Sequence, residues 1–155
     1  WDQYAKMAIN KTSPFIALPM MGVFKCKECT LDECNGLQEA SNYLGLSYQY
    51  LNDVENLVGI NQDICTDIYK NHPNGMLVKI LDKLNKDEKI KIKKQPRLMT
   101  NYINEESFVE QKNNINNLLE DAKNKFHRVP KVVQPVLISI KDEINTRLEK
   151  ILENR

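Results

Sequence analysis

The chain lacks the features that mark membrane-spanning, nucleic-acid-binding or strand-based proteins. No apolar run approaches the roughly 20 residues that a membrane-spanning helix needs. The formal net charge is +1, so no bulk field favours a nucleic-acid partner. Only Ile90-Lys-Ile92 alternates apolar and polar residues, too briefly for a strand. These absences favour a soluble helical protein, which we expect in the cytoplasm.

What is present suffices for one domain with a hydrophobic core, because 41% of the 155 residues are hydrophobic and 28% are charged. Apolar residues recur at helical spacing, and we predict a single all-α domain over 1–155. The predicted helices cover about 2–22, 33–58, 75–85, 105–127 and 132–153. The last two show the clearest apolar faces: Phe108, Ile115, Leu118, Leu119, Ala122 and Phe126, then Val133, Val136, Leu137, Ile140, Ile144, Leu148, Ile151 and Leu152.

Prolines and charged runs mark the breaks between these helices. Pro14 and Pro19 should disturb the first helix, because a proline inside a helix removes one backbone hydrogen bond. Pro96 marks a further break. We expect linkers at 24–32 and 61–75, the second with a short turn at 63–69, and a charged connector at 86–94.

One helical stripe carries most of the candidate chemistry. Four polar side chains lie three or four residues apart and therefore share one face of the predicted helix 33–58. They are Gln49, Asn52, Asp53 and Asn56, backed by Leu44, Tyr48, Leu51 and Leu57. Hard cations such as Mg²⁺ prefer oxygen ligands, often shared with substrate phosphates. The stripe therefore predicts a metal and phosphate site, with Asp53 as its carboxylate and Glu55 at its side.

The segment that carries this stripe resembles the second aspartate-rich motif of the trans-isoprenyl diphosphate synthases, the polyprenyl synthetases. The family reads Gly-x-x-Phe-Gln-x-x-Asp-Asp-x-x-Asp, with a glycine three residues on. This chain reads Gly45-Leu-Ser-Tyr48-Gln49-Tyr-Leu-Asn52-Asp53-Val-Glu-Asn56, followed by Gly59. Asparagine stands at two of the three aspartate positions, so the motif is degenerate.

Two further segments strengthen the resemblance. Lys11-Thr12, followed by an apolar run, stands at about the upstream distance at which the family has a helix with Lys-Thr or Lys-Ser. Downstream, 66–72 precedes an apolar helix and is similar to the family's Asp-Ile/Leu-x-x-Gly/Asn-Lys segment. The likeness covers residues 1 to about 85, and beyond that it is only to a helical tail.

The resemblance implies the C-terminal half of the isoprenoid-synthase fold, an all-α helical bundle. Family members are about twice as long, and their N-terminal half carries the first aspartate-rich motif, which grips the allylic diphosphate through Mg²⁺. Nothing like Asp-Asp-x-x-Asp occurs here. We therefore expect isoprenyl diphosphates as ligands, Mg²⁺ as cofactor, a dimer, and an N-terminal half or complementary chain that supplies the first motif. A lone half should expose apolar faces meant for the other.

The resemblance also assigns roles to residues that match the family's motifs. Lys11 and Thr12 would contact the diphosphate, because a lysine offers charge and a threonine offers a hydroxyl donor. Gln49 would point at the diphosphate or stabilise the developing carbocation through its amide oxygen. Aromatic side chains would wall the hydrocarbon pocket: Phe15, Tyr48 and Tyr50.

The metal positions fall on Asn52, Asp53 and Asn56. An asparagine oxygen is neutral and therefore a weaker ligand for Mg²⁺ than a carboxylate. Asp63 and His72 also stand where the family commonly has lysines. The side that binds isopentenyl diphosphate is thus eroded.

We predict a Mg²⁺-dependent prenyltransferase that condenses an allylic diphosphate with isopentenyl diphosphate. The eroded motif leaves open a terpene cyclase on the same fold, a peptide-modifying prenyltransferase, or a non-catalytic regulatory subunit. Cyclases read Asn/Asp-Asp-x-x-Ser/Thr-x-x-x-Glu, and here Asn56 and Ile60 stand at the Ser/Thr and Glu places. Peptide-modifying prenyltransferases also show asparagine in this motif. A plain helical scaffold would depend on neither diphosphate nor Mg²⁺.

Two other features favour ordinary interpretations. Cys26-Lys-Glu-Cys29, with Cys34 nearby, is half of a zinc pattern, but no fourth ligand stands close in sequence. We therefore interpret this segment as a surface linker with reduced thiols. The lysines of 86–94 are typical of a solvated connector rather than a lipid contact.

Overall fold

The structure is a computed structural model that describes residues 1–25, 29–58, 67, 70 and 72–153. These residues form helices and no strand, which confirms the predicted all-α class. None of the described helices is long and apolar enough to cross a membrane. The elements are α1 (Asp2–Lys25), α2 (Leu31–Val58), α4 (Gly75–Lys83), α5 (Lys86–Lys94), the 3₁₀ helix η1 (Pro96–Tyr102), α6 (Glu105–Lys123), the 3₁₀ helix η2 (Phe126–Arg128) and α7 (Gln134–Glu153).

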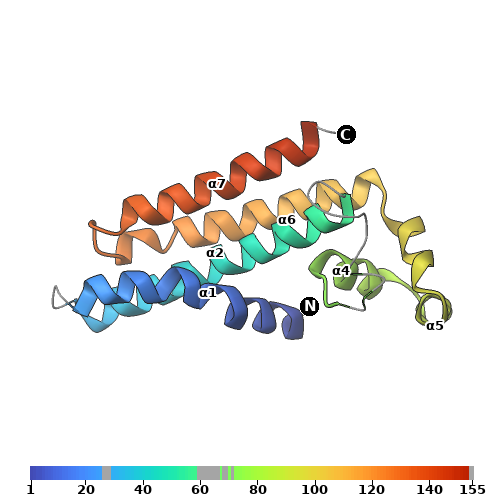
Figure 1. Cartoon of the computed structure of the whole chain (residues 1–155), viewed down its shortest axis with the longest axis horizontal. Helices are drawn as coiled ribbons and strands as arrows, with labels where there is room; N and C mark the ends of the chain where they lie inside the picture. Colours follow the sequence, from blue (N-terminus) through green and yellow to red (C-terminus); the bar gives the residue numbers. More distant parts are fainter. Residues whose placement is uncertain (26–28, 59–66, 68–69, 71, 154–155) are drawn as a thin grey trace.

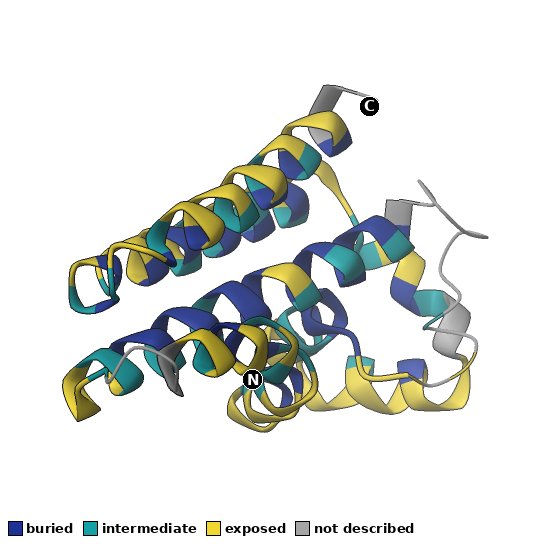
Figure 2. Ribbon diagram, turned by 60° about the vertical axis from the view of Figure 1, so that its left-hand side comes forward, coloured by how far each residue is buried: buried dark blue, intermediate teal, exposed yellow. Residues whose placement is uncertain are grey.

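Helix α2 is the centre of the bundle, because α1, α4, α6 and α7 all pack against it (Figure 1). Helices α6 and α7 run alongside it, and α5 lies at one end of an elongated molecule (Figure 1). Buried residues line the inner faces of these helices, with exposed residues outward (Figure 2). The fully buried aliphatic side chains from α2, α6 and α7 include Leu37, Leu44, Leu51, Ile115, Leu119, Leu137 and Ile144.

Helix α1 continues through both of its prolines and ends at Lys25, three residues later than predicted. Figure 1 shows that α1 changes direction along its length, as proline-containing helices do. It lies very close to α2 at Gly45, where an added Cβ would stand 2.6 Å from Ser13 Oγ and 2.8 Å from Ser13 N. Because Gly45 has no side chain, the two helices can approach this closely.

The prediction of a connector at 86–94 is wrong, because this segment forms the helix α5. Asn85 accepts a hydrogen bond from Glu88 N, and the Glu88 side chain accepts one from Asn85 N, which makes a capping box. Acidic residues in the first turn and lysines in the last turn suit the helix dipole. Local capping thus outweighs the low hydrophobicity of the segment.

The other boundaries differ less. Helix α6 ends at Lys123, and the predicted continuation to 127 is instead the turn and 3₁₀ helix around Phe126. Helix α7 begins at Gln134, and Val136, predicted on its apolar face, is 48% exposed. The turn predicted at 63–69 lies almost wholly outside the described residues.

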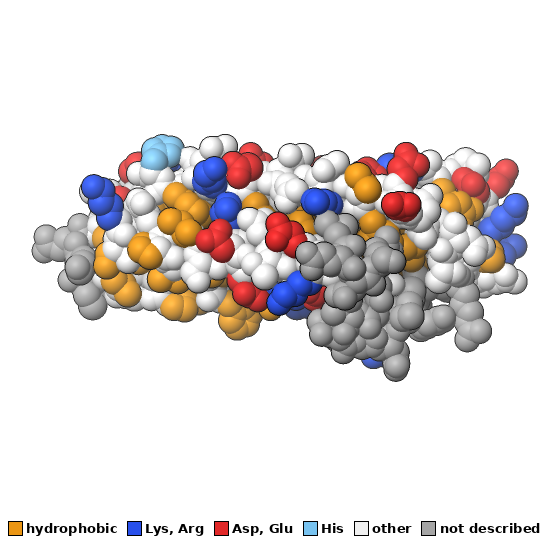
Figure 3. Space-filling model, turned by 90° about the horizontal axis from the view of Figure 1, so that it is seen from above, with side chains coloured by type: hydrophobic (Ala, Val, Ile, Leu, Met, Phe, Trp, Pro, Cys, Tyr) orange, Lys and Arg blue, Asp and Glu red, His pale blue; other side chains and the backbone are white. Residues whose placement is uncertain are grey.

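Several apolar side chains remain exposed on α1 and near α7. Phe15 is 80% exposed and Leu18 is 65% exposed on α1. Figure 3 views the side on which α7 lies and shows hydrophobic side chains scattered among charged ones. On α7 and just before it, Val132, Val136 and Ile138 are exposed. That a second half covers such surfaces stays a prediction.

Candidate functional site

The polar stripe of α2 lines one cavity of about 510 Å³, as its spacing predicts. Lys11 from α1 and Arg147 from α7 line the same cavity. The other lining residues are Gln49, Asn52, Asp53, Glu55, Asn56, Asp67, Lys70 and His72. The structure therefore brings together every predicted metal position and two of the predicted diphosphate contacts, Lys11 and Gln49.

Asp53 is the most deeply buried member of the stripe, at 3% exposure. Its Oδ2 accepts hydrogen bonds from Tyr4 Oη at 2.5 Å and from Gly75 N at 2.6 Å, and its Oδ1 accepts one from Gln49 Nε2 at 2.9 Å. Burial raises the pKa of Asp53 to about 6, while these three donors oppose the rise. Asp53 thus joins α2 to the start of α1 and the start of α4.

Asn52 and Glu55 are both held by Arg147, which reaches across from α7. Arg147 Nε donates to Glu55 Oε1 at 3.0 Å, and Nη2 donates to Glu55 Oε2 at 2.5 Å and to Asn52 Oδ1 at 2.7 Å. The guanidinium carbon also lies 5.0 Å from the centre of the Tyr48 ring. This is a two-pronged arginine–carboxylate pair with an aromatic neighbour, the geometry that arginine favours.

Helix α1 places two of the predicted site residues near the stripe. Lys11 is exposed and faces the cavity. Thr12 Oγ1 donates to Gln49 Oε1 at 3.5 Å, the outer limit of a hydrogen bond. Thr12 of the predicted Lys-Thr pair therefore contacts the predicted glutamine, although Thr12 itself is not among the lining residues of the cavity.

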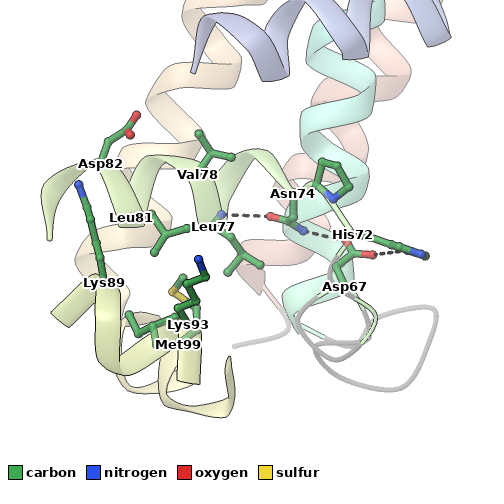
Figure 4. Close-up of a pocket in the computed structure, with 12 residues that line it drawn as sticks. Asp67, His72, Asn74, Leu77, Val78, Leu81, Asp82, Lys89, Lys93 and Met99 are labelled. Atoms are coloured by element: carbon green, nitrogen blue, oxygen red, sulfur yellow. Dashed lines mark hydrogen bonds and ion pairs between the residues drawn. The ribbon is translucent and has the colours of Figure 1, made fainter. Parts of the chain in front are cut away.

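A set of hydrogen bonds around Asn74 and Asp67 connects the C-terminal end of the stripe with α4 (Figure 4). Asn74 is 1% exposed and caps α4 by accepting from Leu77 N. Its Nδ2 donates to Asp53 O and to Asp67 Oδ2, each at 3.0 Å, and Asn56 Oδ1 accepts from Asp67 N at 3.2 Å. Sequence reasoning missed Asn74, although an asparagine before an apolar helix is a cap signature.

An apolar cavity of about 650 Å³ adjoins the polar one and shares Asp67 and His72 with it. Figure 4 shows side chains from α4 and from the segment that follows it lining this cavity, two lysines among them. The apolar lining includes Leu77, Val78, Leu81, Ile92 and Met99, and the lysines are Lys89 and Lys93. Sequence reasoning missed this cavity because it treated α5 as a connector.

The three aromatic residues named for a hydrocarbon pocket lie in different surroundings. Phe15 lines neither cavity, and Tyr48 contacts Arg147 rather than an apolar space. Tyr50 is fully buried in the core, where its hydroxyl donates to Gln111 Oε1.

The donor set does not fit a Mg²⁺ ion bound by this chain alone. Asn52 and Glu55 face a guanidinium, Asp53 accepts three protein hydrogen bonds, and Asn56 accepts one from Asp67. Magnesium requires near-octahedral oxygen ligands. Among the residues that the structure covers, no group of three His, Cys, Asp or Glu side chains could hold a metal ion.

Comparison with known proteins relates the chain to one protein family. The family model described as polyprenyl synthetase matches residues 1–119, which extends the likeness well past residue 85. No curated protein and no solved structure matches the chain.

Proposed function

The chain belongs to the polyprenyl synthetase family and has its all-α isoprenoid-synthase fold, and on that premise we propose that it forms the diphosphate-binding wall of a prenyltransferase. The substrates would be an allylic diphosphate and isopentenyl diphosphate. The family match over residues 1–119 carries the proposal.

The cations around the polar cavity support this choice of ligand. Lys11, Lys70 and Arg147 line it from three different parts of the chain. A diphosphate needs several positive charges and hydrogen-bond donors at once, and lysine and arginine supply them in complementary ways. The amides of Gln49 and Asn52 add neutral polar groups on the same wall.

In the proposed reaction the allylic C–O bond breaks and diphosphate leaves with the bonding electrons. The alkene of isopentenyl diphosphate attacks the resulting carbocation, and loss of a proton restores a double bond. Lys11 and Thr12 would hold the departing diphosphate. Gln49 lies between Thr12 and Asp53, so its amide oxygen would be held in place near the developing positive charge.

The proposal requires a complementary part. The first aspartate-rich motif is not in this sequence, and the described carboxylates of the polar cavity are engaged within the protein. The Mg²⁺ on which the family generally depends would therefore be held by an N-terminal half or a partner chain. We also propose a dimer, as the family resemblance implies.

The test is the native mass of the purified assembly, followed by turnover with labelled isopentenyl diphosphate, allylic diphosphates and Mg²⁺. We expect a second polypeptide with an Asp-Asp-x-x-Asp motif and a longer labelled diphosphate. A lone 18.0 kDa chain that is monodisperse and inert to diphosphates would overturn the proposal.

A matched pair of variants tests the assigned wall. Lys11→Gln should raise KM for the allylic diphosphate by about tenfold or more, because a charge-assisted contact is lost. Lys6→Gln removes an exposed lysine from the same helix that lines neither cavity, and it should leave KM unchanged. Equal effects of the two variants would remove Lys11 from the site.

A non-catalytic regulatory subunit is the second candidate, favoured by the engagement of Asp53 and Glu55 in internal contacts. It predicts that turnover by a separate catalytic chain changes when this chain binds, while Lys11→Gln has no effect. The turnover assay also separates the remaining alternatives: a cyclic product without isopentenyl diphosphate indicates a cyclase, and a prenylated peptide indicates a peptide-modifying enzyme.

A further inference from the structure

We propose that Arg147 is a built-in cation that occupies the metal position of the polar stripe and excludes divalent ions from it. The inference rests on the proposed function only in treating the stripe as the counterpart of a metal-binding motif. Arg147 lies beyond residues 1–119, so the family match assigns it no role.

The position of the guanidinium supports the replacement. Arg147 bridges Asn52 of the stripe and Glu55 at the side of the stripe through three hydrogen bonds of 2.5 to 3.0 Å. Glu55 is 9% exposed and Arg147 is 21% exposed, so the pair is largely withdrawn from water yet faces the cavity. These bonds hold the guanidinium of Arg147 in one position beside the cavity.

The charges of the stripe also suit a monovalent cation better than a divalent one. Asparagine at positions 52 and 56 removes two negative charges relative to the family's motif. Asp53 directs both carboxylate oxygens to donors from Tyr4, Gly75 and Gln49. The remaining carboxylate, Glu55, is balanced by one guanidinium. A divalent ion would have to displace Arg147 and leave its charge without a partner.

With a guanidinium in place of a metal ion, an anionic ligand would contact different groups in the cavity. A diphosphate that enters the cavity would find a guanidinium edge beside Lys11 and Lys70. Arginine presents fixed N–H donors that match phosphate oxygens, and it needs no metal to do so. A diphosphate in this cavity would therefore need no metal ion bound by the stripe itself.

The experiment titrates the full chain with Mn²⁺ alone and follows free Mn²⁺ by electron paramagnetic resonance. Arg147→Met should bind Mn²⁺ at least about tenfold more tightly than the wild type, because the competing cation is gone and Glu55 is released. Arg128→Met removes an arginine that also pairs with carboxylates of α2 but lies outside the cavity, and it should leave Mn²⁺ affinity unchanged. Adding Glu55→Gln to Arg147→Met should abolish the gain.

A second variant keeps the test decisive if Arg147→Met fails to fold. Asn52→Asp restores one carboxylate of the family motif while Arg147 stays in place. We expect no new Mn²⁺ site, because the added carboxylate pairs with the guanidinium. Tight Mn²⁺ binding by the wild type or by Asn52→Asp, or no gain in a folded Arg147→Met, would overturn the inference.

These measurements need no isoprenyl diphosphate, so the two proposals can fail separately. A chain that shows the expected Mn²⁺ pattern but never yields a prenylated product keeps the Arg147 inference and loses the proposed function. A chain that turns over with Mn²⁺ bound at Asn52 and Glu55 does the reverse.

Discussion

Two arginines tie the C-terminal part of the chain to the two ends of α2, and their surroundings differ. Arg128 donates to Asp32 at 2.7 Å and to both oxygens of Glu39 at 3.1 Å near the start of the helix. Arg147 makes the equivalent pair with Glu55 near the end. The chemistry is the same, but Asp32 and Glu39 are 69% and 40% exposed, whereas Glu55 is 9% exposed.

The difference shows how exposure decides what an ion pair does. Water and salt screen the Arg128 cluster, so it positions η2 on α2 with little energetic weight. The Arg147 pair lies against a cavity and an aromatic ring, where screening is weaker. The first is an exposed contact between η2 and α2, whereas the second lines the cavity in which we propose that the diphosphate binds.

The largest expected effect comes from the helix contact that lies between the two clusters. Gly45→Ala would force a Cβ against the backbone of Ser13 and push α1, with Lys11 and Thr12, away from the stripe. We expect a loss of about 3 kcal/mol in the free energy of unfolding. Gly22→Ala, where nothing lies within 4 Å, gains the same helix propensity without the clash and should stabilise by up to about 1 kcal/mol. Urea unfolding of both variants measures the difference.

The next effect is the dependence of stability on pH, which we expect from Asp53 of α2. Burial raises the pKa of Asp53 from 3.8 to about 6, so the folded chain holds this proton more tightly than the unfolded chain does. The resulting stability is fully present below about pH 4 and is lost as pH rises through 6. Relative to Asp53→Asn, which cannot titrate, wild-type stability should fall by about 2–3 kcal/mol between pH 4 and 7. If the difference in the free energy of unfolding between the wild type and Asp53→Asn is the same at every pH, the prediction is wrong.

The comparison itself is tested by removing each arginine. Arg147→Gln leaves Glu55 withdrawn from water without its cation, and we expect a loss of about 1–2 kcal/mol, reduced from the fully buried case because Arg147 is partly exposed. Arg128→Gln should cost clearly less, because its partners are hydrated. Equal losses in urea unfolding would show that exposure does not separate the two clusters.

The smallest effect is the response to salt. At about 1 M ionic strength the screening length is about 3 Å, so any difference between Arg128→Gln and the wild type should disappear. The difference between Arg147→Gln and the wild type should persist, because the pair is shielded by protein. Unfolding at low and high sodium chloride measures both.

Periodicity predicted the arrangement of residues within a helix but not the contacts that reach a helix from elsewhere. The shared face of Gln49, Asn52, Asp53 and Asn56 follows from spacing, and these residues do line one cavity. The burial of Asp53 depends on Tyr4 and Gly75, which are distant in sequence. No local pattern reports such contacts.

Arg147 shows the same limit from the other direction. It stands between Ile144 and Leu148 on a helix whose polar residues are mostly solvated, so nothing in its own segment distinguishes it. The helix at 86–94, by contrast, was within reach of sequence reasoning. Asn85 and Glu88 have the spacing of a capping box, and the density of lysines obscured that signal.

The bonds of Asp53 to Tyr4 and Gly75 have a consequence for mutagenesis. Asp53, which the family resemblance predicts as a metal position, also connects three helices, so a substitution there affects folding as well. Inactivity of an Asp53 variant therefore cannot assign it a role in chemistry. Lys11 is exposed, so we expect that changing it leaves the bundle intact and tests the proposed ligand contact separately from folding.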